Sequence, residues 1–308
     1  MGEKHLSILI NKFGKVVLCS ADAVGGKALA EKYGCKFYGD TDTMLACETI
    51  DYASVCTPTP THKAISISLL KHKIPVLCEK PFALTREDAE AILNAAEENG
   101  TPLMVAHCAR FSKANEYLKR CVNDKRFGKL LYLKLFRHSP IPRWSVSGWL
   151  HDTKKSGGIV MDLHIHDTDV IRSALGMPTC VKTVSTPLSS STIYGYEDCV
   201  VSADATWRLD DKFVFESGYD AFFEEASVRS VGDAVTVTKN GTTINPLTDE
   251  SFPDFSGDDA YDNEITYFIN CIEADARPDL CLPSDSLDSL SISLAEIESA
   301  NIGACKAV

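Results

Sequence analysis

Lys80 and the pair Asp162 and His166 are the residues of this sequence best suited to move protons. Lys80 follows an apolar run at residues 74–78 that is typical of a buried strand, so we expect its amine near a strand's carboxyl end. Asp162 and His166 are four residues apart, and on a helix they would share one face. An amine, an imidazole and a carboxylate brought together could exchange a proton with a bound hydroxyl group.

Each of these motifs also has a simpler interpretation. A Glu-Lys-Pro tripeptide alone is usually a strand end that meets a turn, and a D-x-x-x-H spacing is more often a surface pair. The cluster Asp162, His164, His166 and Asp167 could instead supply metal ligands. We rank that reading well below proton transfer, because His164 and His166 would point to different faces of a helix. The sequence therefore predicts no metal site.

The composition excludes several other classes of function. The chain has 308 residues, of which 44% are hydrophobic and 24% are charged, enough for about two domains. Its net charge of −12 argues against nucleic acid as a partner, since phosphate binding requires clustered Lys and Arg. No apolar run approaches the roughly 18 residues of a spanning helix, and no signal peptide is evident, so we expect no membrane association and a cytoplasmic location.

The twelve cysteines form no C-x-x-C pair, which argues against a zinc ribbon and a redox motif. Most of them lie singly inside apolar runs, and we expect reduced side chains that pack as small hydrophobic groups.

Strand and helix patterns alternate along the first hundred residues. Thr85 and Asp88 resemble a capping box, and Thr59 with Pro60 resembles another helix start. The alternation predicts a parallel sheet joined by right-handed crossovers, which binds ligands at the carboxyl ends of its strands. We expect strands at residues 15–21, 35–38, 52–56, 74–78 and 103–106, and helices at 4–13, 25–33, 41–47 and 85–100.

After about residue 108 most expected elements are strands that alternate polar with apolar residues, which suits a sheet buried on one face. We therefore predict an α/β protein with two domains. Residues 1–108 would form a Rossmann-like dinucleotide-binding domain, and residues 109–308 an α+β domain with a large, mainly antiparallel sheet. Within the second domain we expect strands at residues 130–136, 181–186, 199–207, 213–219, 225–230 and 234–238, and helices at 159–175 and 284–302.

Four segments, taken in order, resemble the motifs of the Gfo/Idh/MocA family of oxidoreductases. Any one of them alone would be weak, but all four occur at the spacing of that family. They are a T-P-x-x-x-H stretch at Thr57, Pro58 and His62, the E-K-P tripeptide at Glu79, Lys80 and Pro81, a G-G-x-x-x-D-x-x-x-H-x-x-D signature from Gly157 to Asp169, and Asn263-Glu264 before a late helix.

The resemblance implies an NAD-dependent dehydrogenase that oxidises a secondary alcohol of a cyclic polyol, a sugar or a sugar derivative, with an inositol-like substrate favoured. It implies a catalytic group of Lys80, Asp162 and His166, and a homodimer or homotetramer built on the open face of the second sheet. The positions expected to bind the cofactor are Gly2, Asp22, Thr57, Pro58, His62, Glu79 and Lys80. Those expected to contact the substrate are Trp149, His107 and Arg110, and Trp144 is a further aromatic candidate.

The family's first strand and G-x-G-x-x-G turn are not found in the sequence. Gly2 resembles the third glycine of that turn, and Asp22, twenty residues later, resembles the acid that binds the ribose. No Arg closely follows Asp22 to accept a 2′-phosphate, so NAD is favoured over NADP. We expect that roughly ten residues are missing, through a late start codon, a shortened chain or a real loss of cofactor binding, the first two being favoured.

A non-catalytic regulatory protein that binds NAD or a sugar is the alternative, because the wider family includes an NAD-binding repressor. The retained Lys80, Asp162 and His166 favour the enzyme, whereas the absent glycine turn favours the regulator. A metal-dependent hydrolase using His164 and His166 is the third and least favoured reading.

Overall fold

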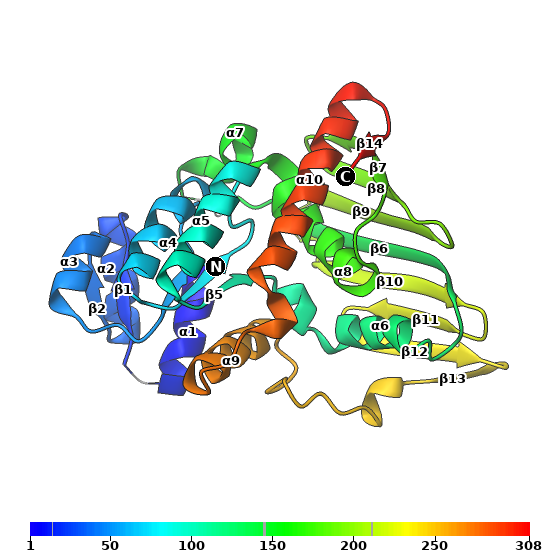
Figure 1. The fold of residues 1–308 in the computed structure, drawn as a ribbon, viewed down its shortest axis with the longest axis horizontal. Coiled ribbons are helices and arrows are strands. Elements are labelled where there is room, and N and C mark those ends of the chain that lie inside the picture. Colours follow the sequence, from blue (N-terminus) through cyan, green and yellow to red (C-terminus); the bar gives the residue numbers. More distant parts are fainter. Residues whose placement is uncertain (14, 144–145, 211) are drawn as a thin grey trace.

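A computed structural model describes residues 1–13, 15–143, 146–210 and 212–308. Parallel strands flanked by helices form the N-terminal part, and a broad, mainly antiparallel sheet forms the C-terminal part (Figure 1). This confirms the fold class expected from the sequence.

The N-terminal part alternates helices and strands as predicted. Its elements are α1 (Gly2–Phe13), β1 (Val17–Cys19), α2 (Ala23–Tyr33), β2 (Lys36–Tyr38), α3 (Thr41–Cys47), β3 (Ala53–Val55), α4 (His62–Lys71), β4 (Val76–Glu79), α5 (Arg86–Asn99) and β5 (Leu103–Ala106).

The C-terminal part contains most of the strands. Its main elements are α6 (Lys113–Asn123), β6 (Leu130–Pro140), α7 (Thr153–Ser156), α8 (Ile165–Leu175), β7 (Cys180–Thr186), β8 (Ser189–Gly195), β9 (Val200–Arg208), β10 (Glu216–Phe223), β11 (Ser227–Val231), β12 (Ala234–Lys239), β13 (Thr242–Ile244), α9 (Ala260–Glu273), α10 (Pro283–Ile302) and β14 (Lys306–Ala307).

The parallel strands form two separate ladders rather than one sheet. β1 pairs with β2, and β3, β4 and β5 pair in that order. In the described part of the chain, one edge of β1 and one edge of β3 have no strand partner.

The large sheet has the order β13-β12-β11-β10-β6-β9-β8-β7-β14. Its central pair, β6 and β9, is parallel, and the other neighbours are antiparallel. Residues from α6, α8 and α10 pack with the buried face of this sheet in one core. The opposite face carries the more exposed side chains of the same strands.

Helices α9 and α10 return to the N-terminal part. Ile265 and Phe268 of α9 pack with Ile8 of α1, and Leu290 of α10 packs with Ile92 of α5. The late helices therefore complete hydrophobic cores that begin in the first hundred residues.

Local structure corrects several sequence expectations. The helix expected at Thr59 and Pro60 begins instead at His62, after a 3-10 turn at Thr59–Thr61. The physical reason is a local turn, in which the Thr61 hydroxyl donates to Thr57 Oγ1 and to the Pro58 carbonyl, both at 2.7 Å. The helix start expected at Thr85 is confirmed, because Thr85 Oγ1 accepts from the Asp88 amide at 3.2 Å.

The helix expected at residues 159–175 has two parts. Val160–His164 forms one turn of π-helix, which continues into α8. The strands β8, β13 and β14 were not expected, and the strand expected from residue 213 begins at Glu216. No helix in the described ranges combines the length and apolar character needed to cross a membrane.

Candidate active site

Lys80 stands immediately after β4, where the chain leaves the carboxyl end of the strand. Its Nζ donates to the carbonyl oxygen of Asp162 at 2.6 Å and to Asp162 Oδ1 at 3.2 Å. The two side chains are 11% and 22% exposed, so this ion pair is partly shielded from solvent. It joins two motifs that are 82 residues apart in the sequence.

His166 follows Asp162 across the junction between the π-turn and α8. The residue is 9% exposed, and its Nδ1 has no hydrogen-bond partner among the described residues. Burial lowers the pKa of His166 well below its usual value, and the Lys80 ammonium lowers it further. His166 is therefore a neutral imidazole near pH 7, close enough to Lys80 to feel its charge.

A buried ion pair, Arg137 with Asp167, stands beside this group. The guanidinium donates from Nη2 to Asp167 Oδ1 at 2.7 Å, and its charge also lowers the pKa of His166. Arg137 lies in β6, whose alternation predicted a strand but gave no sign of a buried cation.

Arg110 and Asp169 form a second buried ion pair behind the catalytic candidates. Arg110 donates from Nε and Nη2 to the two carboxylate oxygens of Asp169, each at 2.7 Å, and from Nη1 to Asp285 and the Leu280 carbonyl. Burial alone would raise the pKa of Asp169, but Arg110 lowers it to about 2. The donors of Arg110 are thus engaged within the protein, which argues against its expected substrate contact.

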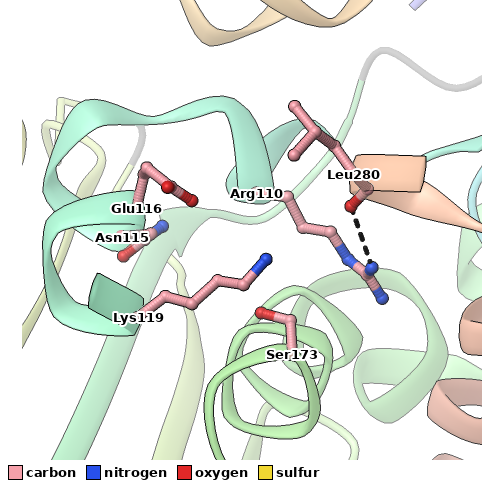
Figure 2. A pocket seen from close by; sticks show the side chains of 6 residues that line it. All are labelled: Arg110, Asn115, Glu116, Lys119, Ser173 and Leu280. Atoms are coloured by element: carbon pink, nitrogen blue, oxygen red, sulfur yellow. Dashed lines mark hydrogen bonds between the residues drawn. The ribbon is translucent and has the colours of Figure 1, made fainter. Parts of the chain in front are cut away.

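The pocket beside Arg110 is too small for a substrate. Figure 2 shows Arg110 with its bond to the Leu280 carbonyl at the edge of this space. Its volume of about 10 Å³ holds roughly one water molecule. The other lining residues are Asn115, Glu116, Lys119 and Ser173.

His107 is also enclosed. It is 1% exposed, its Nδ1 is 3.6 Å from Asp169 Oδ1, and burial lowers its pKa to about 4. Trp149 is half-buried in a 3-10 turn at Val146–His151, and Trp144 lies outside the described residues. For Trp149 and His107 a substrate contact stays a prediction.

The expected cofactor residues gather at the carboxyl ends of neighbouring strands. His62 holds two of these segments together, since its Nε2 is 2.7 Å from the Thr57 carbonyl and its Nδ1 is 3.1 Å from the Pro81 carbonyl. Thr57 and Pro58 follow β3, while Glu79 ends β4 and accepts a hydrogen bond from the Lys80 amide at 3.0 Å.

Asp22 and Gly2 lie at the starts of helices. Asp22 follows β1 and caps α2, where its Oδ1 accepts from the Gly25 amide at 3.0 Å. Gly2 begins α1, and a Cβ atom built on it would lie 3.7 Å from Cys56 Cβ, next to the end of β3. Carboxyl strand ends and helix starts are where dinucleotides bind in such folds.

The sequence did not predict a buried polar group that contacts Glu79. His5 Nε2 is 3.1 Å from Glu79 Oε1, and its Nδ1 is 2.7 Å from Ser54 Oγ. Glu264 is fully buried, and neither of its carboxylate oxygens has a hydrogen-bond partner in the part of the chain that the structure describes. Burial raises the pKa of Glu264 well above the usual value, and the negative charge of Glu79 raises it further. Glu264 belonged to a recognised motif, but its burial depends on long-range packing.

His164 does not join this site. It is fully buried near the large sheet, with Nε2 at 3.1 Å from Thr192 Oγ1 and at 3.2 Å from the Tyr194 hydroxyl. Within the described ranges, no three His, Cys, Asp or Glu side chains are grouped to hold a metal ion.

Two family models match this chain. Residues 1–107 match the oxidoreductase family with an NAD-binding Rossmann fold, and residues 115–234 match the Gfo/Idh/MocA C-terminal domain. Together they cover more than half of the sequence. The chain belongs to the Gfo/Idh/MocA family of oxidoreductases. NAD is the cofactor of this family, as the first matching model states.

Curated relatives of this family member carry out different reactions. A 2,7-anhydro-N-acetylneuraminate hydratase from Mediterraneibacter gnavus is 30% identical over 55% of this chain, an alignment that spans only 45% of the relative. An inositol 2-dehydrogenase from Rhizobium meliloti is 27% identical, over 97% of this chain and 93% of the relative. The chain thus spans about half the length of some curated relatives and nearly all of others.

A solved structure supports the fold over the whole chain. An oxidoreductase from Agrobacterium radiobacter, in complex with NAD+, L-tartaric acid and magnesium, superposes with a TM-score of 0.83 at 20% identity. The alignment covers 99% of this chain and 95% of that structure.

Proposed function

We propose that this protein is an NAD-dependent dehydrogenase that oxidises a secondary alcohol of a cyclic polyol, a sugar or a sugar derivative, with an inositol-like substrate favoured. The observation that carries the proposal is the contact of Lys80 with Asp162, with a neutral His166 beside them. The near full-length similarity to an inositol 2-dehydrogenase supports the choice of substrate.

His166 is the group that we propose takes the proton from the substrate hydroxyl. A neutral, buried imidazole can accept a proton, and its unpartnered Nδ1 leaves a hydrogen-bonding position to fill. Lys80, as an ammonium group, donates hydrogen bonds and would hold the substrate oxygen next to His166. Asp162 keeps the Lys80 side chain in place and can accept from a neighbouring substrate hydroxyl.

The residues present fit the two ends of NAD better than its middle. Asp22 would accept from the adenosine ribose hydroxyls, and its position favours NAD over NADP. Thr57, Pro58, His62, Glu79 and Lys80 would hold the nicotinamide end, and bound NAD would accept the hydride. Within residues 1–308, Gly2 is the position that resembles the motif whose backbone amides hold the pyrophosphate.

An absorbance assay of NAD reduction across inositols, other cyclic polyols and sugars tests the proposal. We expect turnover of at least one cyclic polyol or sugar. A protein that binds NAD and a sugar but oxidises nothing would instead support the regulatory alternative.

The assembly and location are part of the same proposal. The face of the large sheet away from the helices carries exposed apolar side chains, and we propose that it pairs with a second copy to form a dimer or tetramer. We also propose the cytoplasmic location expected from the sequence, and the division into domains at residue 108. Light scattering on the protein and on Ile193→Asp, which places a charge on this face, would test the assembly. The apolar side chains are Val184, Ile193, Val200, Phe222 and Val231.

A further inference from the structure

Cys56 follows β3 and is connected to a buried histidine by polar contacts. Its Sγ is 3.4 Å from Ser54 Oγ, and Ser54 Oγ is 2.7 Å from His5 Nδ1. The other ring nitrogen of His5, Nε2, is 3.1 Å from Glu79 Oε1. A thiol, a hydroxyl, an imidazole and a carboxylate therefore form one continuous chain.

The charge on His5 sets the direction of these hydrogen bonds. Burial alone would lower the pKa of His5, but Cys56 and the Glu79 carboxylate outweigh burial and raise it to about 11. Both ring nitrogens of an imidazolium donate, one to Glu79 and the other to Ser54. The Ser54 hydroxyl is then left to donate to the sulfur of Cys56.

The residues around these four side chains support the same charge distribution. Glu264 and Tyr261 approach His5 from α9; the Tyr261 ring lies 6.3 Å from the His5 ring. Burial raises the pKa of Glu264 well above its usual value, and the negative charge of Glu79 raises it further. Glu264 is therefore neutral, and Glu79 is the carboxylate whose charge balances that of His5. The start of the 12-residue helix α1 is also close to Cys56, and a helix N-terminus carries partial positive charge.

We propose that Cys56 is a modification site: the thiol of this chain that small electrophiles and hydroperoxides attack fastest. Cationic and hydroxyl donors beside a sulfur stabilise the negative charge that the sulfur needs in order to attack. Cys56 is half-buried, so a small reagent can reach it. Its neighbour Thr57 is one of the residues proposed to hold the nicotinamide end of NAD, at the carboxyl ends of β3 and β4. We call these strand ends the proposed cofactor edge, and a group added to Cys56 would obstruct it.

The chemistry requires only the reagent itself. With hydrogen peroxide, the sulfur bonds to one oxygen as the O–O bond breaks, which gives a sulfenic acid and water. With iodoacetamide, the sulfur bonds to the methylene carbon, iodide leaves with the electron pair of the carbon–iodine bond, and the thiol proton passes to solvent.

Competitive labelling of the full chain tests the site. The native protein is treated at pH 7 with limiting iodoacetamide, and the labelling rate of each cysteine is measured by peptide mass spectrometry. We expect Cys56 to react at least about tenfold faster than Cys47 and Cys305, which are exposed. Equal or slower labelling of Cys56 overturns the proposal.

Ser54→Ala tests the chain of contacts while leaving the pair of His5 and Glu79 in place. We expect it to slow Cys56 labelling by about tenfold and to leave Cys47 unchanged. Ser7→Ala, which removes a serine hydroxyl from the surface of α1, is the matched control and should change neither rate. An unchanged Cys56 rate in a folded Ser54→Ala protein would mean that the contacts do not activate the thiol. His5→Gln is the second variant and should slow Cys56 in the same way.

The expectation that a group on Cys56 obstructs NAD binding rests on the proposed function. It is tested separately, by measuring whether NAD protects Cys56 from labelling. Saturating NAD should slow the labelling of Cys56 and leave that of Cys47 unchanged. Fast labelling that NAD does not slow would support the reactive thiol and contradict the proposed cofactor edge. Slow labelling in a protein that binds NAD would overturn the modification site alone.

Discussion

Lys80 and Asp162 belong to different parts of the fold and meet in one partly buried ion pair, with Nζ 3.2 Å from Oδ1. Lys80 directly follows the parallel strand β4, and Asp162 lies in the π-turn before α8. The contact therefore places the two strongest sequence motifs in one site.

Replacing Lys80 with alanine should lower turnover by about 10²-fold or more, because a group that acts on the reacting hydroxyl is lost. NAD binding should weaken far less, because Lys80 is only one of several residues proposed to hold the nicotinamide end. Reduced-cofactor absorbance and NAD titration measure the two effects. Lys63→Ala, which removes an exposed lysine paired with Asp88, is the control and should turn over normally. Normal turnover by Lys80→Ala would remove Lys80 from the catalytic group.

The pH profile of kcat/KM should report His166. A proton acceptor works only when neutral, so activity should fall as pH drops through the pKa of His166, which lies below its usual value of 6.5. His166→Asn should reduce kcat/KM by about 10²-fold and remove this acid limb. His138→Asn, on the open face of the large sheet, should keep it. An acid limb that persists in His166→Asn must arise from another group.

Glu296 should make the protein less stable as pH rises. It is buried between α8 and β8, accepts from Tyr194 at 2.7 Å and from Thr168 at 3.0 Å, and burial raises its pKa to about 8. Between its unfolded value of 4.5 and about 8, the unfolded chain releases a proton that the folded chain keeps. The free energy of unfolding therefore falls by about 1.4 kcal/mol per pH unit from this group.

Glu296→Gln should remove that pH dependence. From pH 5.5 to 7.5, we expect the change in unfolding free energy to differ from that of the unmodified protein by roughly 2 to 3 kcal/mol, measured by urea titration. The control is Glu298→Gln, which changes an exposed carboxylate paired with Lys306. Identical pH slopes for Glu296→Gln and the unmodified protein would mean that Glu296 is ionised when folded.

Arg110→Leu should destabilise the fold by about 3 to 5 kcal/mol, because it leaves the fully buried Asp169 carboxylate without its partner. Arg86→Leu removes an arginine of an exposed pair with Glu90 and should cost less than about 1 kcal/mol. Urea denaturation gives both values. A small effect for Arg110→Leu would show that Asp169 is neutralised by protonation or by another donor.

A protein of residues 1–308 alone should bind NAD weakly. The sequence has no G-x-G turn to hold the pyrophosphate, and β1 and β3 each have an unpaired edge in the described part of the chain. Adding a strand and a G-x-G turn ahead of Gly2 should strengthen binding, as measured by calorimetry. Tight binding by residues 1–308 would contradict this expectation.

Local signals in the sequence predicted local structure well. Thr85 and Gly100 fixed both ends of α5, because a side-chain cap and a left-handed residue act within one turn. The alternating residues 199–207 gave β9 nearly to its ends. β8 was missed because its serine-rich sequence, SSSTIYG, lacks the apolar alternation of a typical strand.

The site was only partly predictable, because a sequence shows motifs but not contacts between distant segments. Lys80, Asp162 and His166 stand in motifs with fixed spacing, so their types and positions could be recognised. The contact of His5 with Glu79 and the burial of Glu264 depend on segments far apart in the chain. Arg110 shows the same limit, since only the folded chain shows that Asp169 occupies its donors.

Helix α10 lies between the two parts of the molecule (Figure 1) and packs against both α5 and β7. Its residues are added to the nascent chain long after those of β5. At 5 to 20 residues per second, roughly 10 to 40 seconds separate the synthesis of β5 from that of α10. Until α9 and then α10 are made, the apolar faces of α1 and α5 that these two helices cover lack these partners. The hydrophobic cores of the N-terminal part can therefore be completed only after α9 and α10 have been synthesised.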